Sequence, residues 1–225
     1  MELAKLDQSR DDYFRTQIDR SNSKFTFCKV SYVHVRTWKK VLESTGADLA
    51  GPILCLGTRN GREVDLFRTV FRQGPLLNGM VALNEKEMNG WNPRLPIMES
   101  IGRSSLASQD RSQVLGIEIN PNAKRGDTHI GSFDEMPPEW AGKFKIIYSN
   151  SFDQSQSPYK TAAEWKRVLA PGAFGIFGFS PDTPPTESDP VGRLTYSDFV
   201  DLFKGELVYF HKYGSQYQDV ILHFP

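Results

Sequence analysis

Residues 53–64 read Ile53-Leu54-Cys55-Leu56-Gly57-Thr58-Arg59-Asn60-Gly61-Arg62-Glu63-Val64, the most informative part of the sequence for its fold. A short apolar run ends in a turn with two glycines, and a helical pattern follows with Val64, Phe67 and Phe71 on one face. Gly57 can adopt backbone conformations closed to residues with a Cβ atom, and Gly61 lets a ligand approach closely. In an open parallel sheet, ligands bind beyond the carboxyl ends of the strands. The turn is therefore the predicted binding site.

The rest of the chain alternates strand and helix. The predicted strands are 114–117, 128–130, 144–148 and 173–179, and the predicted helices are 158–169 and 195–204. Thr195 and Asp198 have the spacing of a capping box at the start of the last helix. Strands at 206–213 and 219–224 are close enough in sequence to pair antiparallel. The pattern predicts an α/β fold, a Rossmann-like three-layer sandwich whose mostly parallel sheet is covered on both faces.

The first 46 residues and a long insertion depart from this alternation. A helix is predicted at 2–20, an extended segment at 25–35, and a short helix from a Thr37 cap to Gly46. We interpret residues 1–46 as an accessory segment and residues 47–225 as the main domain. Residues 73–112 are rich in Gly, Asn, Ser and Pro and show no sustained periodicity. Such an insertion is usually a functional lid or a disordered segment.

Composition excludes several classes of protein. The 225 residues include 27 Lys and Arg and 27 Asp and Glu, so no global basic field favours nucleic acid or an anionic membrane. No apolar run approaches the roughly 20 residues of a membrane span, and the first residues lack a signal-peptide core. The two cysteines and four dispersed histidines do not have the spacing of a metal site. We expect a cytoplasmic protein without a metal.

The turn favours a nucleoside without phosphates. A dinucleotide fingerprint needs glycines at positions 57, 59 and 62, and only Gly57 is present. A phosphate-binding P-loop needs Gly-Lys-Ser/Thr where the chain has Gly61-Arg62-Glu63. Glu118, at the tip of the second strand, is placed to accept hydrogen bonds from a ribose diol.

At residues 50–225 the chain resembles the class I S-adenosylmethionine-dependent methyltransferases. The resemblance depends on the order and spacing of five stretches, which lie at 54–64, 116–121, 131–137, 148–153 and 164–173. The last of these contains Arg167-Val168-Leu169-Ala170-Pro171-Gly172-Ala173, similar to the turn before the fifth strand in many of these enzymes.

The resemblance implies a seven-stranded sheet with an antiparallel last strand and S-adenosylmethionine as cofactor. Gly57, Thr58 and Gly61 would surround its methionine part, while Glu118 would hold the ribose and Ile119 would pack on adenine. Ser132, Phe133 and Asp134 would flank the adenine ring. Asn150 and Ser151 would face the sulfonium and the acceptor. Four positions depart from the family pattern: Cys55 and Ser132 replace acidic residues, and Arg59 and Ala173 replace glycines.

Methyl transfer needs alignment of the acceptor, and a base only where the acceptor is protonated. Of the histidines we favour His34, in the segment that could cover the site, over His129 and His211. Asn150 and Asp153 follow the fourth strand, where acceptor contacts are expected. A helix-capping role for Asp153 is the alternative reading.

We expect the acceptor to be a small molecule, reached under a lid made of residues 1–46 and 73–112. Three alternatives stay open: a non-catalytic cofactor-binding subunit whose insertion docks a partner protein, a nicotinamide-dependent oxidoreductase, and a methyltransferase acting on RNA or protein. The neutral net charge disfavours a nucleic-acid substrate.

Overall fold

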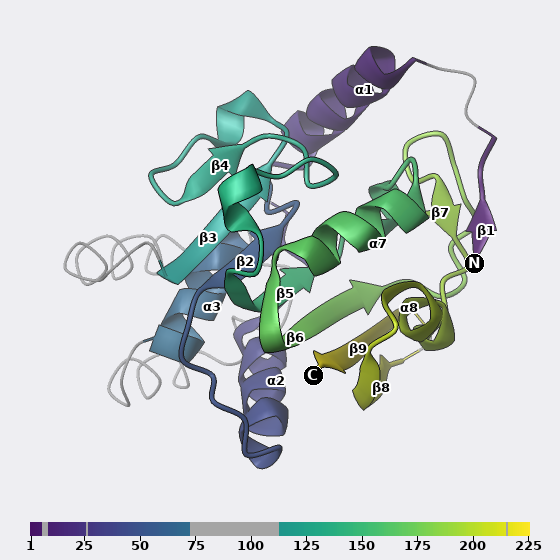
Figure 1. Ribbon diagram of the computed structural model, residues 1–225. Coiled ribbons are helices and arrows are strands. Elements are labelled where there is room, and N and C mark those ends of the chain that lie inside the picture. The colour runs from purple at the N-terminus through teal and green to yellow at the C-terminus, as the bar shows by residue number, and fades with distance from the viewer. Residues whose placement is uncertain (6–8, 26, 73–112, 215) are drawn as a thin grey trace.

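A single seven-stranded sheet organises the chain in the computed structural model, which describes residues 1–5, 9–25, 27–72, 113–214 and 216–225. The strand order is β4-β3-β2-β5-β6-β9-β8 (Figure 1). The bounds are β2 Ile53–Leu56, β3 Val114–Glu118, β4 Thr128–Ile130, β5 Phe144–Ser149, β6 Leu169–Phe179, β8 Glu206–Tyr213 and β9 Tyr217–Phe224. Strands β4, β3, β2, β5 and β6 are parallel, and β9 pairs antiparallel with both β6 and β8. The predicted sheet, including its antiparallel last strand, is confirmed.

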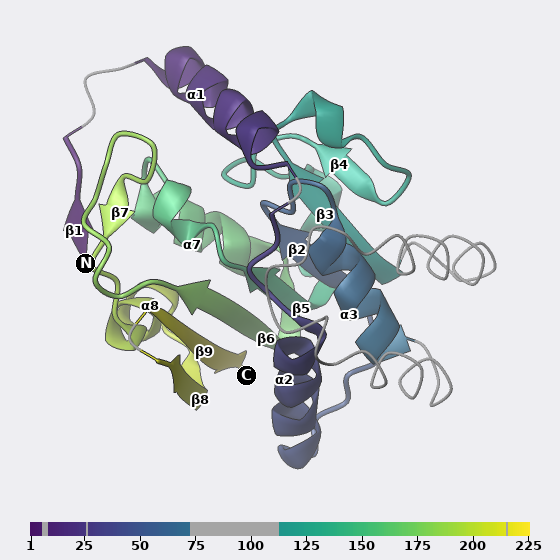
Figure 2. The same cartoon turned by 180° about the vertical axis from the view of Figure 1, so that it is seen from behind.

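Helices cover both faces of the sheet. Helices α2 (Tyr32–Ser44) and α3 (Arg62–Arg72) lie on the face seen in Figure 2. Helices α7 (Pro158–Arg167) and α8 (Tyr196–Phe203) lie on the opposite face, toward the viewer in Figure 1. The three layers follow from β2, whose side chains all point into apolar surroundings. Ile53 and Cys55 join the core under α2 and α3, and Leu54 and Leu56 join the core under α7 and α8.

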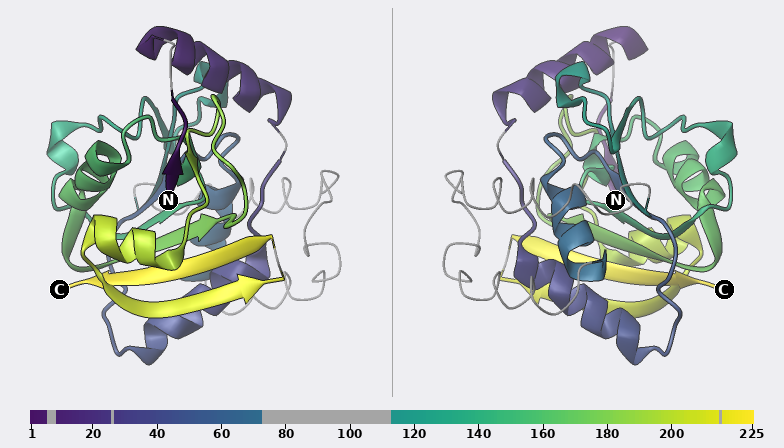
Figure 3. Two further views of the ribbon diagram at one scale, coloured as in Figure 1. Left: turned by 90° about the vertical axis from the view of Figure 1, so that its right-hand side faces the viewer. Right: turned by 90° about the vertical axis from the view of Figure 1, so that its left-hand side faces the viewer.

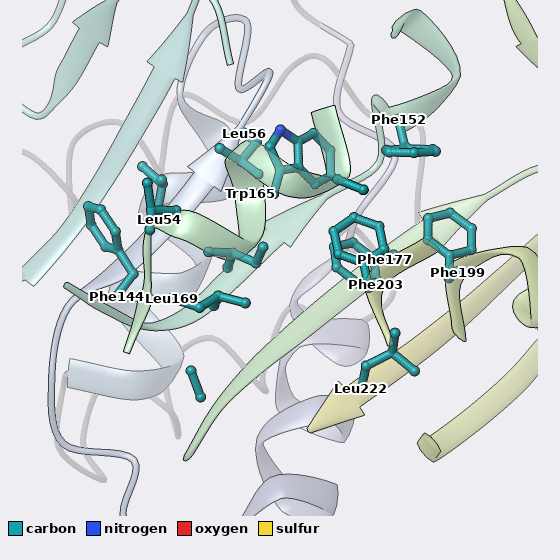
Figure 4. Packing of buried hydrophobic residues seen from close by; sticks show 14 of the residues in the cluster. Leu54, Leu56, Phe144, Phe152, Trp165, Leu169, Phe177, Phe199, Phe203 and Leu222 are labelled. Atoms are coloured by element: carbon teal, nitrogen blue, oxygen red, sulfur yellow. The ribbon is translucent and has the colours of Figure 1, made fainter. Parts of the chain in front are cut away.

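Aromatic side chains fill both cores. Under α7 and α8, the rings of Phe177 and Phe203 stack with centroids 4.6 Å apart, and Trp165 packs beside them (Figure 4). On the other face the Trp38 ring lies 5.3 Å from that of Tyr148. Within the described part of the chain, no helix is long and apolar enough to cross a membrane.

The amino-terminal segment differs from its predicted structure. Helix α1 spans Arg10–Ser23 rather than 2–20, because the Ser9 hydroxyl accepts a hydrogen bond from the Asp12 N–H and caps the helix there. A two-residue strand β1 (Glu2–Leu3) precedes α1 and pairs with β7 (Val191–Gly192). Helix α1 lies at one end of the sheet, outside the two helix layers (Figures 1 and 3).

The predicted strand character of residues 25–35 is wrong for its second half. Helix α2 begins at Tyr32, with Ser31 rather than Thr37 as its cap. The Ser31 N–H donates to His34 Nδ1 at 3.1 Å, and the His34 N–H donates to Ser31 Oγ at 3.4 Å. This reciprocal cap, with burial of Val35, Trp38 and Leu42 on one helix face, outweighs the strand preference of the β-branched residues.

The remaining elements agree with the predictions to within a few residues. The capping box of Thr195 and Asp198 is present at α8, and α7 begins at Pro158 as predicted. Strand β6 starts at Leu169 rather than 173, with an irregular register opposite Phe144–Ile146. Three short 3-10 helices span Pro121–Ala123, Pro138–Trp140 and Phe152–Gln154. The predicted insertion at 73–112 lies outside the described residues.

Candidate functional site

The glycine turn after β2 packs tightly against the chain that follows β5. Gly57 has φ +72°, and its N–H donates to the Ile117 carbonyl at 2.9 Å. A Cβ atom on Gly57 would lie 2.7 Å from Ser151 Oγ and 2.9 Å from Ser151 Cβ. Arg59, two residues later, also has a positive φ, of 50°. Both the backbone angle and the close approach of Ser151 therefore require glycine at position 57.

Glu118 sits at the tip of β3 with its carboxylate surrounded by donors. Its Oε2 accepts from the Arg59 N–H at 2.7 Å, and its Oε1 accepts from the Asn120 N–H at 3.2 Å. The Ser21 hydroxyl of α1 also donates to Oε1, at 3.3 Å. The side chain is 5% exposed, and this burial raises the pKa of Glu118 while the two backbone donors partly offset the rise. A hydroxyl from another element thus already reaches this carboxylate.

A small crevice separates the glycine turn from α1. It is lined by Gln17, Arg20 and Ser21 of α1, by Gly57, Arg59, Glu118 and Ile119, and by Ser151 and Gln154. Its volume of about 20 Å³ is enough for one water molecule. The crevice brings together four residues predicted to bind the cofactor: Gly57, Glu118, Ile119 and Ser151.

Polar contacts hold α1 over this crevice. The Tyr13 hydroxyl donates to the Gln154 carbonyl, and Gln17 Nε2 donates to the Ser188 carbonyl at 2.6 Å. Arg20 forms an ion pair with Asp189. The helix buries Tyr13, Gln17 and Ser21, one residue per turn, and lacks a broad apolar stripe.

Three other predicted cofactor residues lie beside the crevice or behind it. The Phe133 ring comes within 3.9 Å of the position of a Cβ atom on Gly57, so it borders the turn. Asn150 Oδ1 accepts from the Ser151 hydroxyl at 3.3 Å. Asp134 instead accepts a hydrogen bond from Thr161 of α7.

Thr58 and Gly61 do not line the crevice, and each contacts another part of the chain. The Thr58 side chain is buried, and its hydroxyl lies 2.9 Å from the position of a Cβ atom on Gly116. A Cβ atom on Gly61 would lie 2.5 Å from the Arg125 guanidinium. In this structure Gly61 therefore makes room for Arg125.

The predicted catalytic residues occupy different places. His34 caps α2, and its ring packs edge-on against Tyr213 with centroids 4.5 Å apart. Burial and His211 lower the pKa of His34. Asp153 lies near Arg20 and Lys29, and burial together with Asp189 raises its pKa to about 7. The structure does not bring His34 into the crevice lining, whereas Asp153 adjoins Gln154, which lines it.

A buried polar cluster at the ends of β5 and β6 was missed from the sequence. Lys29 Nζ donates to Ser180 Oγ at 2.7 Å and lies 4.4 Å from the centre of the Tyr217 ring. Asp219 Oδ2 accepts from Trp38 Nε1 at 2.9 Å, and burial raises the pKa of Asp219 to about 7. Asp219 Oδ1 lacks a hydrogen-bond partner among the described residues. The available signal was a single carboxylate, Asp219, next to the apolar run 220–222 of β9.

The solved structures that are similar to this chain over nearly its whole length include the following three. The Burkholderia thailandensis 1,6-didemethyltoxoflavin-N1-methyltransferase, solved with 1,6-didemethyltoxoflavin and S-adenosylhomocysteine, has a TM-score of 0.59 and 11% identity, over 99% of this chain and 93% of that one. A Haloferax volcanii putative methyltransferase complex with the Trm112 activator has a TM-score of 0.53 and 13% identity, covering 96% and 98%. The [4+2]-cyclase SpnF has a TM-score of 0.53 and 12% identity, covering 100% and 98%.

The likeness is one of architecture rather than of sequence. No protein-family model matches the chain, and the search of curated proteins finds no match. The alignments with the Haloferax volcanii and Burkholderia thailandensis structures cover nearly the whole length of both chains, at TM-scores of 0.53 and 0.59. The chain has the fold of the class I S-adenosylmethionine-dependent methyltransferases.

Proposed function

We propose that the chain binds S-adenosylmethionine at the crevice between Gly57 and Glu118 and transfers its methyl group to a small-molecule acceptor. The observation that carries this proposal is the Ser21 hydroxyl on the Glu118 carboxylate. A ribose hydroxyl is the same kind of donor, and Glu118 stands at the strand tip where such a group is bound in open parallel sheets. The glycine turn beside it has no phosphate-binding sequence.

The residues around the crevice fit the parts of this cofactor. Glu118 would accept the ribose hydroxyls, while Ile119 and Phe133 offer apolar surface for adenine. Gly57 and Ser151 would border the part of the cofactor that carries the sulfonium. S-adenosylmethionine brings an activated methyl group on sulfur, so the protein has to align the acceptor and exclude water. We infer that these residues form such an enclosure at the end of β2 and β5 once the cofactor is bound.

Helix α1 has to move before a nucleoside can enter. Ligand sites commonly enclose 300–1,000 Å³, whereas this crevice has about 20 Å³. Ser21 holds the carboxylate that the ribose needs, and the contacts of α1 are mostly hydrogen bonds and ion pairs. Such contacts exchange for water at small net cost, since a typical hydrogen bond stabilises by only about 1 kcal/mol. We therefore assign α1 as the lid of the site.

The acceptor would bind next to the polar cluster of Lys29, Tyr217 and Asp219. A carboxyl group with a pKa of about 7 can take a proton near neutral pH. Asp153 has the same property and lies closer to the crevice lining. We accordingly place Asp153 and Asp219 ahead of His34 as proton acceptors, with Asn150 as an acceptor contact. The Burkholderia thailandensis neighbour, whose title names an N1-methyltransferase, is consistent with a small polar acceptor.

Fold likeness alone leaves the reaction open, because a [4+2]-cyclase shares this architecture. The proposal is therefore tested first at the level of binding. A ligand present at 100 times its dissociation constant stabilises the native state by about 2.7 kcal/mol, which for this chain length raises the melting temperature by about 5–10 °C.

We expect S-adenosylmethionine and S-adenosylhomocysteine to give this shift and NAD to give none. Glu118→Gln should abolish the shift in melting temperature. The glutamine side chain has an NH2 group, which donates, in place of one of the two carboxylate oxygens that would accept hydrogen bonds from the ribose. Glu139→Gln makes the same change at an exposed carboxylate outside the crevice lining; it is the control and should leave the shift intact. A shift with NAD alone would favour the oxidoreductase alternative. Transfer of a labelled methyl group to a metabolite extract then separates an enzyme from a non-catalytic subunit.

A further inference from the structure

Glu63 is a buried carboxyl group that has no cationic partner at hydrogen-bonding distance among the residues that the structure describes. It lies in the first turn of α3, directly after the glycine turn, and is 5% exposed. Its Oε2 has no hydrogen-bond partner among the described residues. Burial raises the pKa of Glu63 to about 7. An unpartnered buried carboxylate is destabilising, so its presence calls for an explanation.

The neighbours of Glu63 do not neutralise it. The Cys28 thiol lies 3.3 Å from the Val30 carbonyl and also hydrogen-bonds the Glu63 carboxyl group, but a neutral thiol brings no charge to it. Burial and Glu63 keep the Cys55 thiol neutral, by raising its pKa well above the ordinary value. The positive charge of Arg59 is near enough to lower the pKa of Glu63 in part, but the guanidinium donates its hydrogen bonds to the Lys24 and Phe27 carbonyls, both at 3.2 Å.

Glu63 and Glu118 both lie next to the glycine turn. Glu118 extends from the tip of β3 and accepts the Arg59 N–H, whereas Glu63 belongs to the first turn of α3, which begins directly after Gly61. The two carboxyl groups are close enough for Glu118 to raise the pKa of Glu63. A ligand whose nucleoside sits on Glu118 and whose tail follows the turn would therefore carry that tail toward Glu63.

We propose that Glu63 binds the primary ammonium group in the amino-acid half of the cofactor. This assignment rests on the proposed function, since it takes the nucleoside to be held by Glu118. The assignment also explains how the chain could do without an acidic residue at position 55, where the family pattern has one and this chain has the neutral Cys55. A carboxylate–ammonium hydrogen bond is charge-assisted and satisfies the unpartnered Oε2.

The test compares two ligands that differ only in the amino group. Calorimetric titration is performed with S-adenosylhomocysteine and with its deaminated analogue, on the wild type and on Glu63→Gln. We expect the wild type to bind S-adenosylhomocysteine about 10- to 100-fold more tightly than the analogue, the range for a hydrogen bond to a charged group. Glu63→Gln should bind both ligands with affinities within about twofold of each other and close to that of the wild type for the analogue.

Glu118→Gln is the contrasting variant, because it should weaken both ligands equally. Equal affinity of the wild type for the two ligands would overturn the assignment of Glu63 while leaving the nucleoside site in place, and this comparison needs no variant to fold. A Glu63→Gln protein that still discriminates tenfold would overturn it as well. Absence of binding by either ligand to the wild type would overturn the proposed function and this inference together.

Discussion

Gly57→Ala is expected to lower the affinity for S-adenosylhomocysteine by at least about 100-fold and to destabilise the protein by about 2–4 kcal/mol. The φ of +72° disfavours any residue with a Cβ atom, and that atom would come within 2.9 Å of both Oγ and Cβ of Ser151. Either Ser151 or the turn has to move, and both line the crevice. Urea denaturation and calorimetric titration measure the two effects.

Gly46→Ala is the matched control for this substitution. Gly46 has nearly the same φ, +74°, but a Cβ atom there would meet nothing within 4 Å. It should therefore show the backbone cost alone, about 1–2 kcal/mol, with ligand affinity unchanged. The double variant Gly57→Ala/Ser151→Gly should regain part of the lost stability. Equal losses of stability and affinity in the two alanine variants would contradict the packing of the turn described here.

Asp127→Ala is expected to destabilise the protein by about 3–5 kcal/mol, the largest effect on stability of any variant considered. Asp127 accepts from Arg68 at 2.8 Å and from Arg125 Nε at 2.9 Å. Arg68 is 2% exposed, so removal of the carboxylate takes the nearer of two carboxylates from a buried guanidinium and leaves it with Asp65, at 3.3 Å, and the Val114 carbonyl. Arg125 also donates to the Asn60 carbonyl at 3.1 Å, so the network supports the glycine turn. Urea denaturation at pH 7 measures the loss.

The loss of unfolding free energy at acid pH gives an independent check of the interactions of Asp127. Hydrogen bonds from Arg125 and Arg68 outweigh burial and lower the pKa of Asp127. A carboxylate with a depressed pKa stabilises the native state above its unfolded pKa and loses that contribution as the pH falls through the folded value. The alanine variant should accordingly lose less stability than the wild type between about pH 5 and pH 2. Asp65 is 34% exposed, and Asp65→Ala is the control, which should lower the free energy of unfolding by about 1 kcal/mol at pH 7. An equally small loss of stability in Asp127→Ala would contradict the role given to Asp127.

The strands of the sheet could be predicted because each is a local apolar run bounded by turn residues. Strands β2, β3 and β5 are largely buried on both faces, so their sequences are predominantly apolar, with Lys145 as the exception within β5, and are easy to find. The start of α2 could not be predicted in the same way. Its cap depends on a histidine side chain at 34 that returns to the Ser31 N–H, and its β-branched residues favour a strand until Trp38 and Leu42 are buried.

Parts of the candidate site follow from strand positions and parts do not. Gly57 and Glu118 end neighbouring parallel strands, so their proximity is a consequence of the sheet. The guanidinium of Arg125, 64 positions later, fills the space beside Gly61. The Glu118 carboxylate is contacted by the Ser21 hydroxyl of α1. These contacts join segments whose separation in sequence carries no periodic signal. The division at residue 46 and the catalytic roles of His34, Asn150 and Asp153 stay predictions.

The most direct test of the central claim is a crystal structure of the protein grown with saturating S-adenosylhomocysteine. We predict that the ribose hydroxyls replace the Ser21 hydroxyl on Glu118 and that α1 moves away from the end of the sheet. The homocysteine tail should follow the turn at Gly57 toward Glu63. A structure in which Ser21 still contacts Glu118 and the nucleoside lies elsewhere, or binds nowhere, would contradict the central claim.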